Sequence, residues 1–231
     1  MHSMDNKFKF NCHENLACFG RCCRDINIFL SPYDVLRLKK KLGLSSGEFL
    51  DRYGHRFTAG PTGFPLVFLE MLEEDNLNCP FVSAKGCQVY EERPWACRMA
   101  PVDLLGAGKY GFIFDRAKCH GLKEDREWTV SEWMQNQGVQ IYEEVEAEFK
   151  DIPGRLKMTG REEMDRLIGE LFFTACYNLD EFKKMVGEKE FQAAFGVSPE
   201  EAAKLQVDEL ALLRFGFRWL KELDVTKSSV V

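Results

Sequence analysis

The spacing of apolar and polar positions changes character part-way along the chain. In the first part, apolar runs are short and bounded by glycine, proline or charged residues, which favours short strands at 26–30, 66–72 and 110–114. In the second part, apolar residues recur every three or four positions, the spacing of amphipathic helices. The pattern predicts an α+β fold. A small region of short strands, helices and loops over 1–124 precedes a mainly α-helical region over 125–231, which we expect to pack on the first.

Capping residues mark the ends of the predicted helices. In the first region, Ser31 and Pro32 begin a helix that Gly43 ends, and Ser45 or Ser46 caps a second helix through Tyr53. In the second region, a helix is predicted from the capping box at Thr129 to Phe149, where Pro153 and Gly154 break it, and another over 161–177. A third helix is capped by Asp180, broken near Gly187 and ended by Gly196. Ser198 begins a fourth, and a fifth runs from Asp208 to Leu223. The tail over 226–231 is expected to fray.

Two local patterns have simple structural interpretations. Gly106, Gly108 and Gly111 match a nucleotide-binding glycine motif by letter, but a strand-like run follows where that motif needs a helix, so we expect a hairpin turn. The acidic run from Glu143 to Glu148 is expected to be a solvated helix face.

The overall charge argues against one class of partner. The 231 residues carry a net charge of −6 and give a pI near 5.4, whereas non-specific binding to nucleic acid requires a basic face. The first residues have no apolar core of a signal peptide, and no apolar run approaches the roughly 18–20 residues that span a bilayer. We therefore expect a cytoplasmic protein that binds neither nucleic acid nor membrane.

The nine cysteines are distributed unevenly. Eight lie between Cys12 and Cys119, and only Cys176 lies beyond them, in an apolar stretch where packing explains it. In a reducing cytosol such clustering points to metal ligation or redox chemistry rather than to disulfides. The candidate ligands are Cys12, Cys18, Cys22, Cys23, Cys79, Cys87, Cys97 and Cys119.

Thiolates select zinc, copper(I) or iron–sulfur clusters over hard cations. A tetrahedral zinc ion or a cubane cluster takes four cysteines, so eight thiols fill two sites, or one site with thiols to spare. Neighbouring side chains usually diverge, so Cys22 and Cys23 would serve two centres, or two metals of one centre. Alternatively, one of them is a ligand and the other a buried thiol. His13 and His120 each adjoin a cysteine and are alternative ligands.

The spacings do not fit several common metal motifs. Cys18 and Cys22 could begin the run of a radical S-adenosylmethionine enzyme, but its third cysteine would fall at Asp25. The repeats of ferredoxins and of zinc fingers are also absent. Four thiolates leave a site with a charge of about −2. The basic residues near candidate ligands, which could offset that charge, are Arg21, Arg24, Lys85, Arg93, Arg98, Arg116 and Lys118. Arg93 and Arg98 flank Pro94 and Cys97 in the densest segment, so we expect structural roles for both.

The stretch from Cys87 to Arg98, CQVYEERPWACR, resembles the signature of the YkgJ-type cysteine-cluster family, in which Cys-x-Ile-Tyr is followed by Arg-Pro and Cys-Arg. The family's N-terminal cysteine group ends in a Cys-Cys pair, which Cys12, Cys18, Cys22 and Cys23 resemble. Cys79 matches a further cysteine, and Cys119 with Gly121 matches a late one. This chain departs from the pattern in its longer N-terminal spacings and in Val89, which replaces isoleucine. The resemblance covers residues 10–121.

The resemblance implies a zinc- or iron-chelating or iron–sulfur domain. We therefore expect an iron–sulfur protein, with [4Fe–4S] rather than [2Fe–2S] clusters, in redox or electron transfer. One alternative is a structural zinc module that presents the helical half to a protein partner. Another is an enzyme similar to the flagellin lysine methylases, whose cysteine pattern is alike. No catalytic set of side chains is legible.

Overall fold

The computed structural model describes residues 2–3, 6–60 and 62–223. The chain forms two compact units, the first from residues 1–29 and 69–143 and the second from 30–68 and 144–231. Short strands and helices dominate the N-terminal region and helices the C-terminal region, so the α+β prediction is confirmed. The two units do not follow a single cut near residue 125, because residues 30–68 belong with the C-terminal helices. The domain assignment itself stays a prediction.

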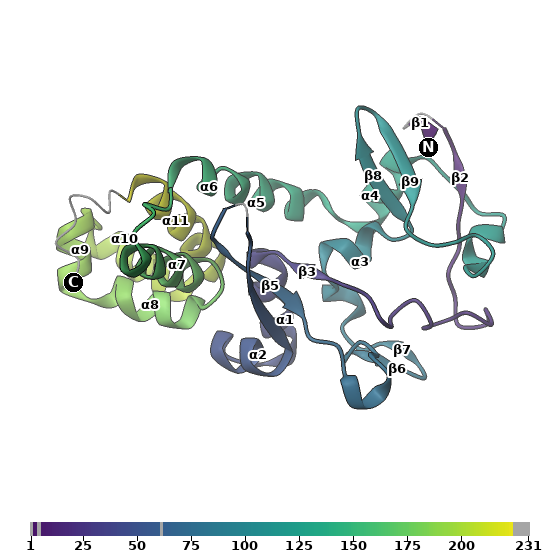
Figure 1. Ribbon diagram of the computed structural model, residues 1–231, viewed down its shortest axis with the longest axis horizontal. Helices are drawn as coiled ribbons and strands as arrows, with labels where there is room; N and C mark the ends of the chain where they lie inside the picture. Colours follow the sequence, from purple (N-terminus) through teal and green to yellow (C-terminus); the bar gives the residue numbers. More distant parts are fainter. Residues whose placement is uncertain (1, 4–5, 61, 224–231) are drawn as a thin grey trace. The chain divides into compact units, whose positions relative to one another are not determined.

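The first unit is built from short elements joined by loops (Figure 1). Its strands are β1 (His2–Ser3), β2 (Phe8–Lys9), β6 (Val82–Ser83), β7 (Gly86–Cys87), β8 (Val102–Gly106), β9 (Lys109–Phe112) and β10 (Glu127–Trp128). Its helices are the 3-10 turns η1 (Glu73–Asp75), η2 (Tyr90–Glu92) and η3 (His120–Lys123), and the α-helices α3 (Trp95–Met99) and α4 (Val130–Gln137).

Strands β8 and β9 form an antiparallel hairpin that pairs Val102 with Phe112 and Leu104 with Tyr110. Gly106 and Gly108 take φ angles of 76° and 69° in its turn, a conformation that side chains rarely adopt. The expected hairpin is therefore confirmed. Strand β1 pairs with β9 and completes a three-stranded sheet in the order β1–β9–β8 (Figure 1).

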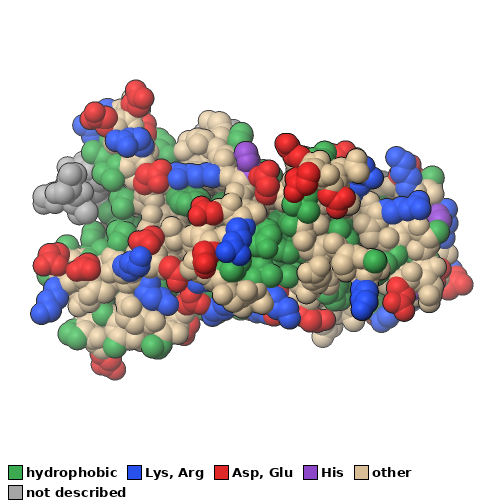
Figure 2. All heavy atoms as spheres, turned by 90° about the horizontal axis from the view of Figure 1, so that it is seen from below, with side chains coloured by type: hydrophobic (Ala, Val, Ile, Leu, Met, Phe, Trp, Pro, Cys, Tyr) green, Lys and Arg blue, Asp and Glu red, His purple; other side chains and the backbone are tan. Residues whose placement is uncertain are grey.

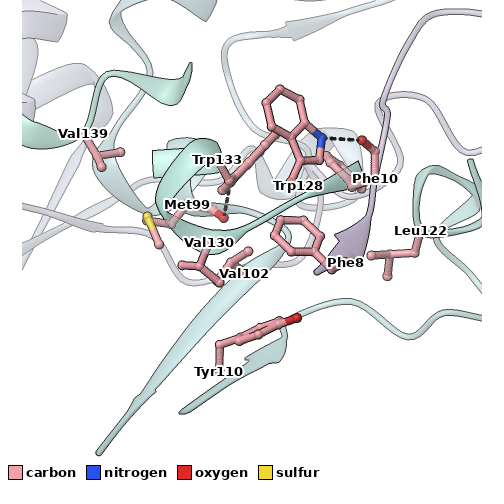
Figure 3. Packing of buried hydrophobic residues seen from close by; sticks show 10 residues of the cluster. All are labelled: Phe8, Phe10, Met99, Val102, Tyr110, Leu122, Trp128, Val130, Trp133 and Val139. Atoms are coloured by element: carbon pink, nitrogen blue, oxygen red, sulfur yellow. Dashed lines mark hydrogen bonds between the residues drawn. The ribbon is translucent and has the colours of Figure 1, made fainter. Parts of the chain in front are cut away.

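An aromatic core joins these strands to helix α4. Strand β2 pairs with β10, and buried rings from both strands pack with residues of the hairpin and of α4 (Figure 3). Both buried indoles have hydrogen-bond acceptors: Trp128 Nε1 donates to Phe10 O over 2.8 Å, and Trp133 Nε1 donates to Met99 O over 3.0 Å. The first unit therefore has a hydrophobic core of its own, in which the buried indole N–H groups are hydrogen-bonded.

The second unit is mostly helical. Its helices are α1 (Pro32–Leu42), α2 (Ser46–Tyr53), α6 (Ile152–Arg155), α7 (Glu162–Cys176), α8 (Leu179–Gly187), α9 (Lys189–Phe195), α10 (Pro199–Val207) and α11 (Glu209–Glu222), while α5 (Gln140–Lys150) begins in the first unit. Strands β3 (Phe29–Leu30), β5 (Pro65–Leu69) and β4 (Gly54–Thr58) form one sheet in that order. The chain passes between the two units in β3, at the end of β5 and within α5.

Most of the predicted caps are confirmed. Ser31 caps α1 in a capping box with Asp34, and Gly43 ends the helix at a φ of 67°. Ser45 caps α2. In the C-terminal helices, the side chains of Ser198 and Asp208 accept hydrogen bonds from the first turns of α10 and α11.

Two predictions about helix ends are wrong. The helix expected over 129–149 is two helices, because Gly138 takes a φ of 62° and ends α4. The end predicted near Phe149 is confirmed, because α5 ends at Lys150 before Pro153. Pro153 and Gly154 lie in the separate short helix α6, where proline in the first turn lacks only an N–H that has no helical partner. The residue before α8 is Asn178, whereas Asp180 lies in its first turn. The tail over 226–231 lies outside the described residues.

Asp180 instead belongs to a buried ionic cluster of the second unit. Lys39, 4% exposed, lies 2.5 Å from Glu209 Oε1 and 3.2 Å from Asp180 Oδ2, and Asp180 also accepts a hydrogen bond from the Ser46 backbone N–H. These residues come from α1, α2, α8 and the start of α11. The cluster therefore connects helices that are far apart in sequence.

The surface carries mixed charge. Figure 2 shows acidic and basic side chains interspersed over the face that it draws. Within the part of the chain that the structure describes, no helix has both the length and the apolar character needed to cross a bilayer.

Candidate metal centre

The loop that carries Cys119 is hydrogen-bonded to the N-terminal cysteine loop. The backbone N–H of Asn11 donates to Gly121 O over 3.0 Å, and the N–H of His120 donates to Sγ of Cys18 over 3.3 Å. A side chain at Gly121 would lie 2.9 Å from the Phe10 ring and 3.1 Å from Asn11 O, so only glycine fits this approach. Residues more than 100 positions apart are thus held side by side.

A second set of contacts holds Cys23 near Cys79. The backbone N–H of Cys79 donates to Cys23 O over 2.9 Å, and Val82 N–H donates to Cys79 O over 3.1 Å. Val82 in turn pairs with Cys87 across the β6–β7 ribbon. Cys97 lies in α3, which starts immediately after Pro94.

The electrostatics of the thiols show which cysteines are neighbours. Burial, and then the charges of Cys22, Cys18 and Cys119, raise the pKa of Cys12 to about 11. Burial also raises the pKa of Cys119, and Cys18 and Cys22 contribute in the same direction. Cys12, Cys18, Cys22 and Cys119 therefore form one group, which we call the first set.

The remaining four thiols form a second group. Burial raises the pKa of Cys79, and the charge of Cys87 raises it further. A hydrogen bond with Cys22 and burial are the main causes that raise the pKa of Cys23, and Cys79 and Cys97 add to them. Cys23, Cys79, Cys87 and Cys97 are the second set.

The adjacent cysteines Cys22 and Cys23 link the two sets. Their side chains are hydrogen-bonded, and this bond is the largest cause that lowers the pKa of Cys22, to about 7. Cys22 lies with the first set and Cys23 with the second. The arrangement corresponds to the sequence alternative in which the adjacent cysteines serve two centres.

The chemistry of these donors fits zinc or iron, since each set supplies four thiols. Among the residues that the structure describes, however, no three cysteine, histidine or acidic side chains are drawn together closely enough to hold one ion. The thiols are thus grouped but not at coordination distance, and the eight ligands stay a prediction. Of the alternative ligands, His13 has its Nε2 3.4 Å from Glu124 Oε2, and His120 contacts Cys18 through its backbone.

Two of the seven basic residues near the cysteines are buried. Arg93 and Arg98 are each 8% exposed. The other five, Arg21, Arg24, Lys85, Arg116 and Lys118, are exposed. The structural roles expected for Arg93 and Arg98 are confirmed, because their guanidinium groups are bound by neighbouring backbone carbonyls.

Gln137 is a part of this network that the sequence did not reveal. Its side-chain Oε1 accepts a hydrogen bond from Arg93, and its backbone carbonyl accepts one from Arg98 over 2.7 Å. No local pattern marks this residue, since it lies 44 positions from Arg93 at the end of a helix. Cys176, by contrast, is fully buried in the second unit, as its apolar surroundings predicted.

A comparison with protein-family models matches residues 11–132 to CxxCxxCC, described as a "putative zinc- or iron-chelating domain". The chain belongs to this family. The match covers more than half of the chain and includes all eight cysteines of the two sets, as well as Arg93 and Arg98. Membership of this chelating family confirms the resemblance and indicates metal binding. No curated protein and no solved structure matches the chain.

Proposed function

We propose that the first unit holds iron–sulfur clusters in two four-cysteine centres and works in redox chemistry or electron transfer. What supports this proposal is that, apart from Cys22 with Cys23, the thiols influence one another within two groups of four, and that backbone hydrogen bonds connect Cys18 with His120 and Cys23 with Cys79. Each set has the number of thiolates that a [4Fe–4S] cluster takes. The first set would comprise Cys12, Cys18, Cys22 and Cys119, and the second Cys23, Cys79, Cys87 and Cys97.

Two features suit a thiolate-bound redox centre. A backbone N–H already points at the sulfur of Cys18, and such hydrogen bonds tune the reduction potential of clusters. The second set also lies near positive charge, since burial raises the pKa of Cys87 while a backbone hydrogen bond from Val89 and then the charge of Arg93 oppose that rise. A bound cluster would supply one-electron chemistry. The residues of this chain would hold it, shield it from water and offset its charge.

Anaerobic purification with iron, sulfide and zinc analysis tests the proposal. We expect a brown protein with broad visible absorption and about eight iron and eight sulfide per chain, the content of two [4Fe–4S] clusters. A colourless protein with stoichiometric zinc and no sulfide would overturn it.

Zinc is the second candidate, because the cysteines lie in loops whose strands are only two residues long. A structural zinc ion contributes folding energy to loops of this kind. The aromatic core around Trp128 and Trp133 separates the two candidates. If zinc folds the unit, chelation removes the near-ultraviolet circular dichroism of these indoles. If the protein carries redox clusters, cluster loss bleaches the colour and leaves that signal in place.

A further inference from the structure

Arg93 and Arg98 are buried cations with no carboxylate at ion-pair distance among the described residues. Each side chain is 8% exposed, and neither guanidinium forms an ion pair with a carboxylate among the described residues. Arg93 donates to Tyr90 O over 2.5 Å and to the Gln137 side chain. Arg98 donates to Arg93 O over 3.0 Å and to the carbonyls of Gln137 and Glu91.

These hydrogen bonds fix the groups but do not neutralise them. Every acceptor is an uncharged carbonyl or amide oxygen. The guanidinium carbon of Arg93 also lies 3.8 Å from the centre of the Tyr90 ring, and that of Arg98 lies 4.8 Å from the centre of the Tyr142 ring. Removing a cation from water is costly unless an anion lies nearby, and two cations in one network also repel each other. The network therefore lacks a buried counter-charge, since the nearby carboxylate of Glu91 is exposed to solvent.

The thiols of the second set are the acidic groups placed to supply it. Arg93 lies between Cys87 and Cys97 in sequence, and Arg98, which directly follows Cys97 in α3, donates to Arg93 O. The charge of Glu91 also acts on Arg93, but Glu91 is exposed to solvent. Four thiolates around a divalent ion or an oxidised cubane leave a charge of about −2. Two buried guanidinium groups carry the charge that balances it.

We propose that Arg93 is the charge-compensating residue of the second centre, that Gln137 fixes its position, and that Arg98 supplies the second positive charge. This inference rests on the proposed function, because it requires a thiolate centre at Cys23, Cys79, Cys87 and Cys97. It goes beyond that function in making the two centres unequal, since the buried cations lie beside the second set.

Gln137→Glu is the most direct test, because it keeps the acceptor of the Arg93 hydrogen bond and adds a competing negative charge. The variant is made in a Cys18→Ala background, which disables the first set and leaves the second to be measured alone. Cobalt(II) is the probe, titrated anaerobically against a competing chelator, since its thiolate complexes absorb visibly. We expect a Kd for cobalt 10- to 100-fold higher than in Cys18→Ala alone, the range for loss of an outer-sphere partner. The melting temperature of the metal-free protein should stay equal or rise.

Arg93→Gln, Arg93→Lys and Arg24→Gln complete the series. Arg93→Gln should weaken cobalt binding as strongly as Gln137→Glu, while Arg93→Lys keeps the charge and should weaken it less. Arg24 also adjoins a second-set cysteine but is exposed, so Arg24→Gln removes a solvent-screened charge and should change the Kd less than threefold.

The outcomes separate this inference from the proposed function. If the Cys18→Ala protein binds no cobalt, the two-centre proposal itself fails. If it binds cobalt and Gln137→Glu leaves the Kd unchanged, only the role of Arg93 is overturned. A Kd that rises together with a fall in the melting temperature of the metal-free variant would also overturn it, because Gln137 would then act only on the fold.

Discussion

The backbone N–H of His120 donates a hydrogen bond to the sulfur of Cys18 over 3.3 Å, between residues 102 positions apart. This contact places the last cysteine of the family region beside the first cysteine group. It shows that the first set is assembled by the fold and not by one contiguous motif. The second set is assembled in the same way, through the hydrogen bond between Cys79 and Cys23.

Single cysteine substitutions should remove one centre at a time. Cys119→Ala is expected to abolish metal at the first set, and Cys87→Ala at the second. Each variant should retain about half of the wild-type metal, because the two sets meet only through neighbouring residues of the chain, Cys22 and Cys23. Metal analysis of anaerobically purified protein measures this. Cys176→Ala is the control, since that thiol is buried in the second unit, and it should retain all the metal. Loss of all metal from both set variants would instead indicate a single shared centre.

Gly121→Ala should impair the first set without changing any cysteine. The added methyl group would lie 2.9 Å from the Phe10 ring and 3.1 Å from Asn11 O, so the Cys119 loop would move away from Cys18. We expect the metal affinity of the first set, measured by competition with a chelator, to fall at least tenfold, in line with the effect of outer-sphere changes. Gly154→Ala is the matched control, because nothing lies within 4 Å of the position that its methyl group would take. Equal metal retention in the two variants would contradict the argument.

Lys39→Met should destabilise the second unit strongly. The ammonium group is 5% exposed at its side chain and pairs with Glu209 and Asp180, so its removal leaves two carboxylates near each other without their buried cation. We expect a loss of about 3–5 kcal/mol, measured by urea denaturation followed by far-ultraviolet circular dichroism. Lys40→Met is the comparison, since Lys40 pairs with the same Glu209 from a half-exposed position. It should cost about 1 kcal/mol or less.

Glu146→Gln should stabilise the protein at pH 8 and not at pH 4. Burial raises the pKa of Glu146 from 4.5 to about 7, with Lys150 opposing the shift and Asp34 adding to it, and its Oε2 atom is buried without a hydrogen-bond partner. Below pH 4.5 the carboxyl is protonated in both the folded and the unfolded state. Between pH 4.5 and 7 the unfolded state binds fewer protons than the folded state, so stability falls as the pH rises. Above pH 7 the full loss of stability is present, and Glu146→Gln should raise the free energy of unfolding by on the order of 2–3 kcal/mol.

Urea denaturation at the two pH values measures this difference. Glu144→Gln, on the exposed side of the same helix, should change stability little at either pH. A stabilisation by Glu146→Gln that is equal at pH 4 and pH 8 would show that the ionised carboxylate is not the cause. The result also corrects the sequence expectation that the whole acidic run is solvated, because Glu146 is partly buried while Glu144 is exposed.

Local sequence signals predicted the secondary structure well where the cause is local. Ser31 and Gly43 delimit α1 because a side-chain oxygen and a left-handed glycine act within one turn of the chain. The same holds for Ser198, Asp208 and the Gly106 turn. One error arises where tertiary contacts decide. Asp180 has the chemistry of a cap but is used by Lys39 and Ser46. Gly138 is a different kind of error, because it ends α4 by the same local left-handed conformation as Gly43 and the apolar pattern that continues beyond it concealed this.

The sequence by itself determined the kind of chemistry and the family. Eight clustered cysteines and the Arg-Pro signature need no coordinates to be recognised, because ligand identity and short spacings are properties of the chain. Only the tertiary structure decided which cysteine loops lie side by side and which arginines are buried away from ion-pair partners. Those properties depend on hydrogen bonds and burial between residues up to 102 positions apart, such as Cys18 and His120, and no local pattern encodes them.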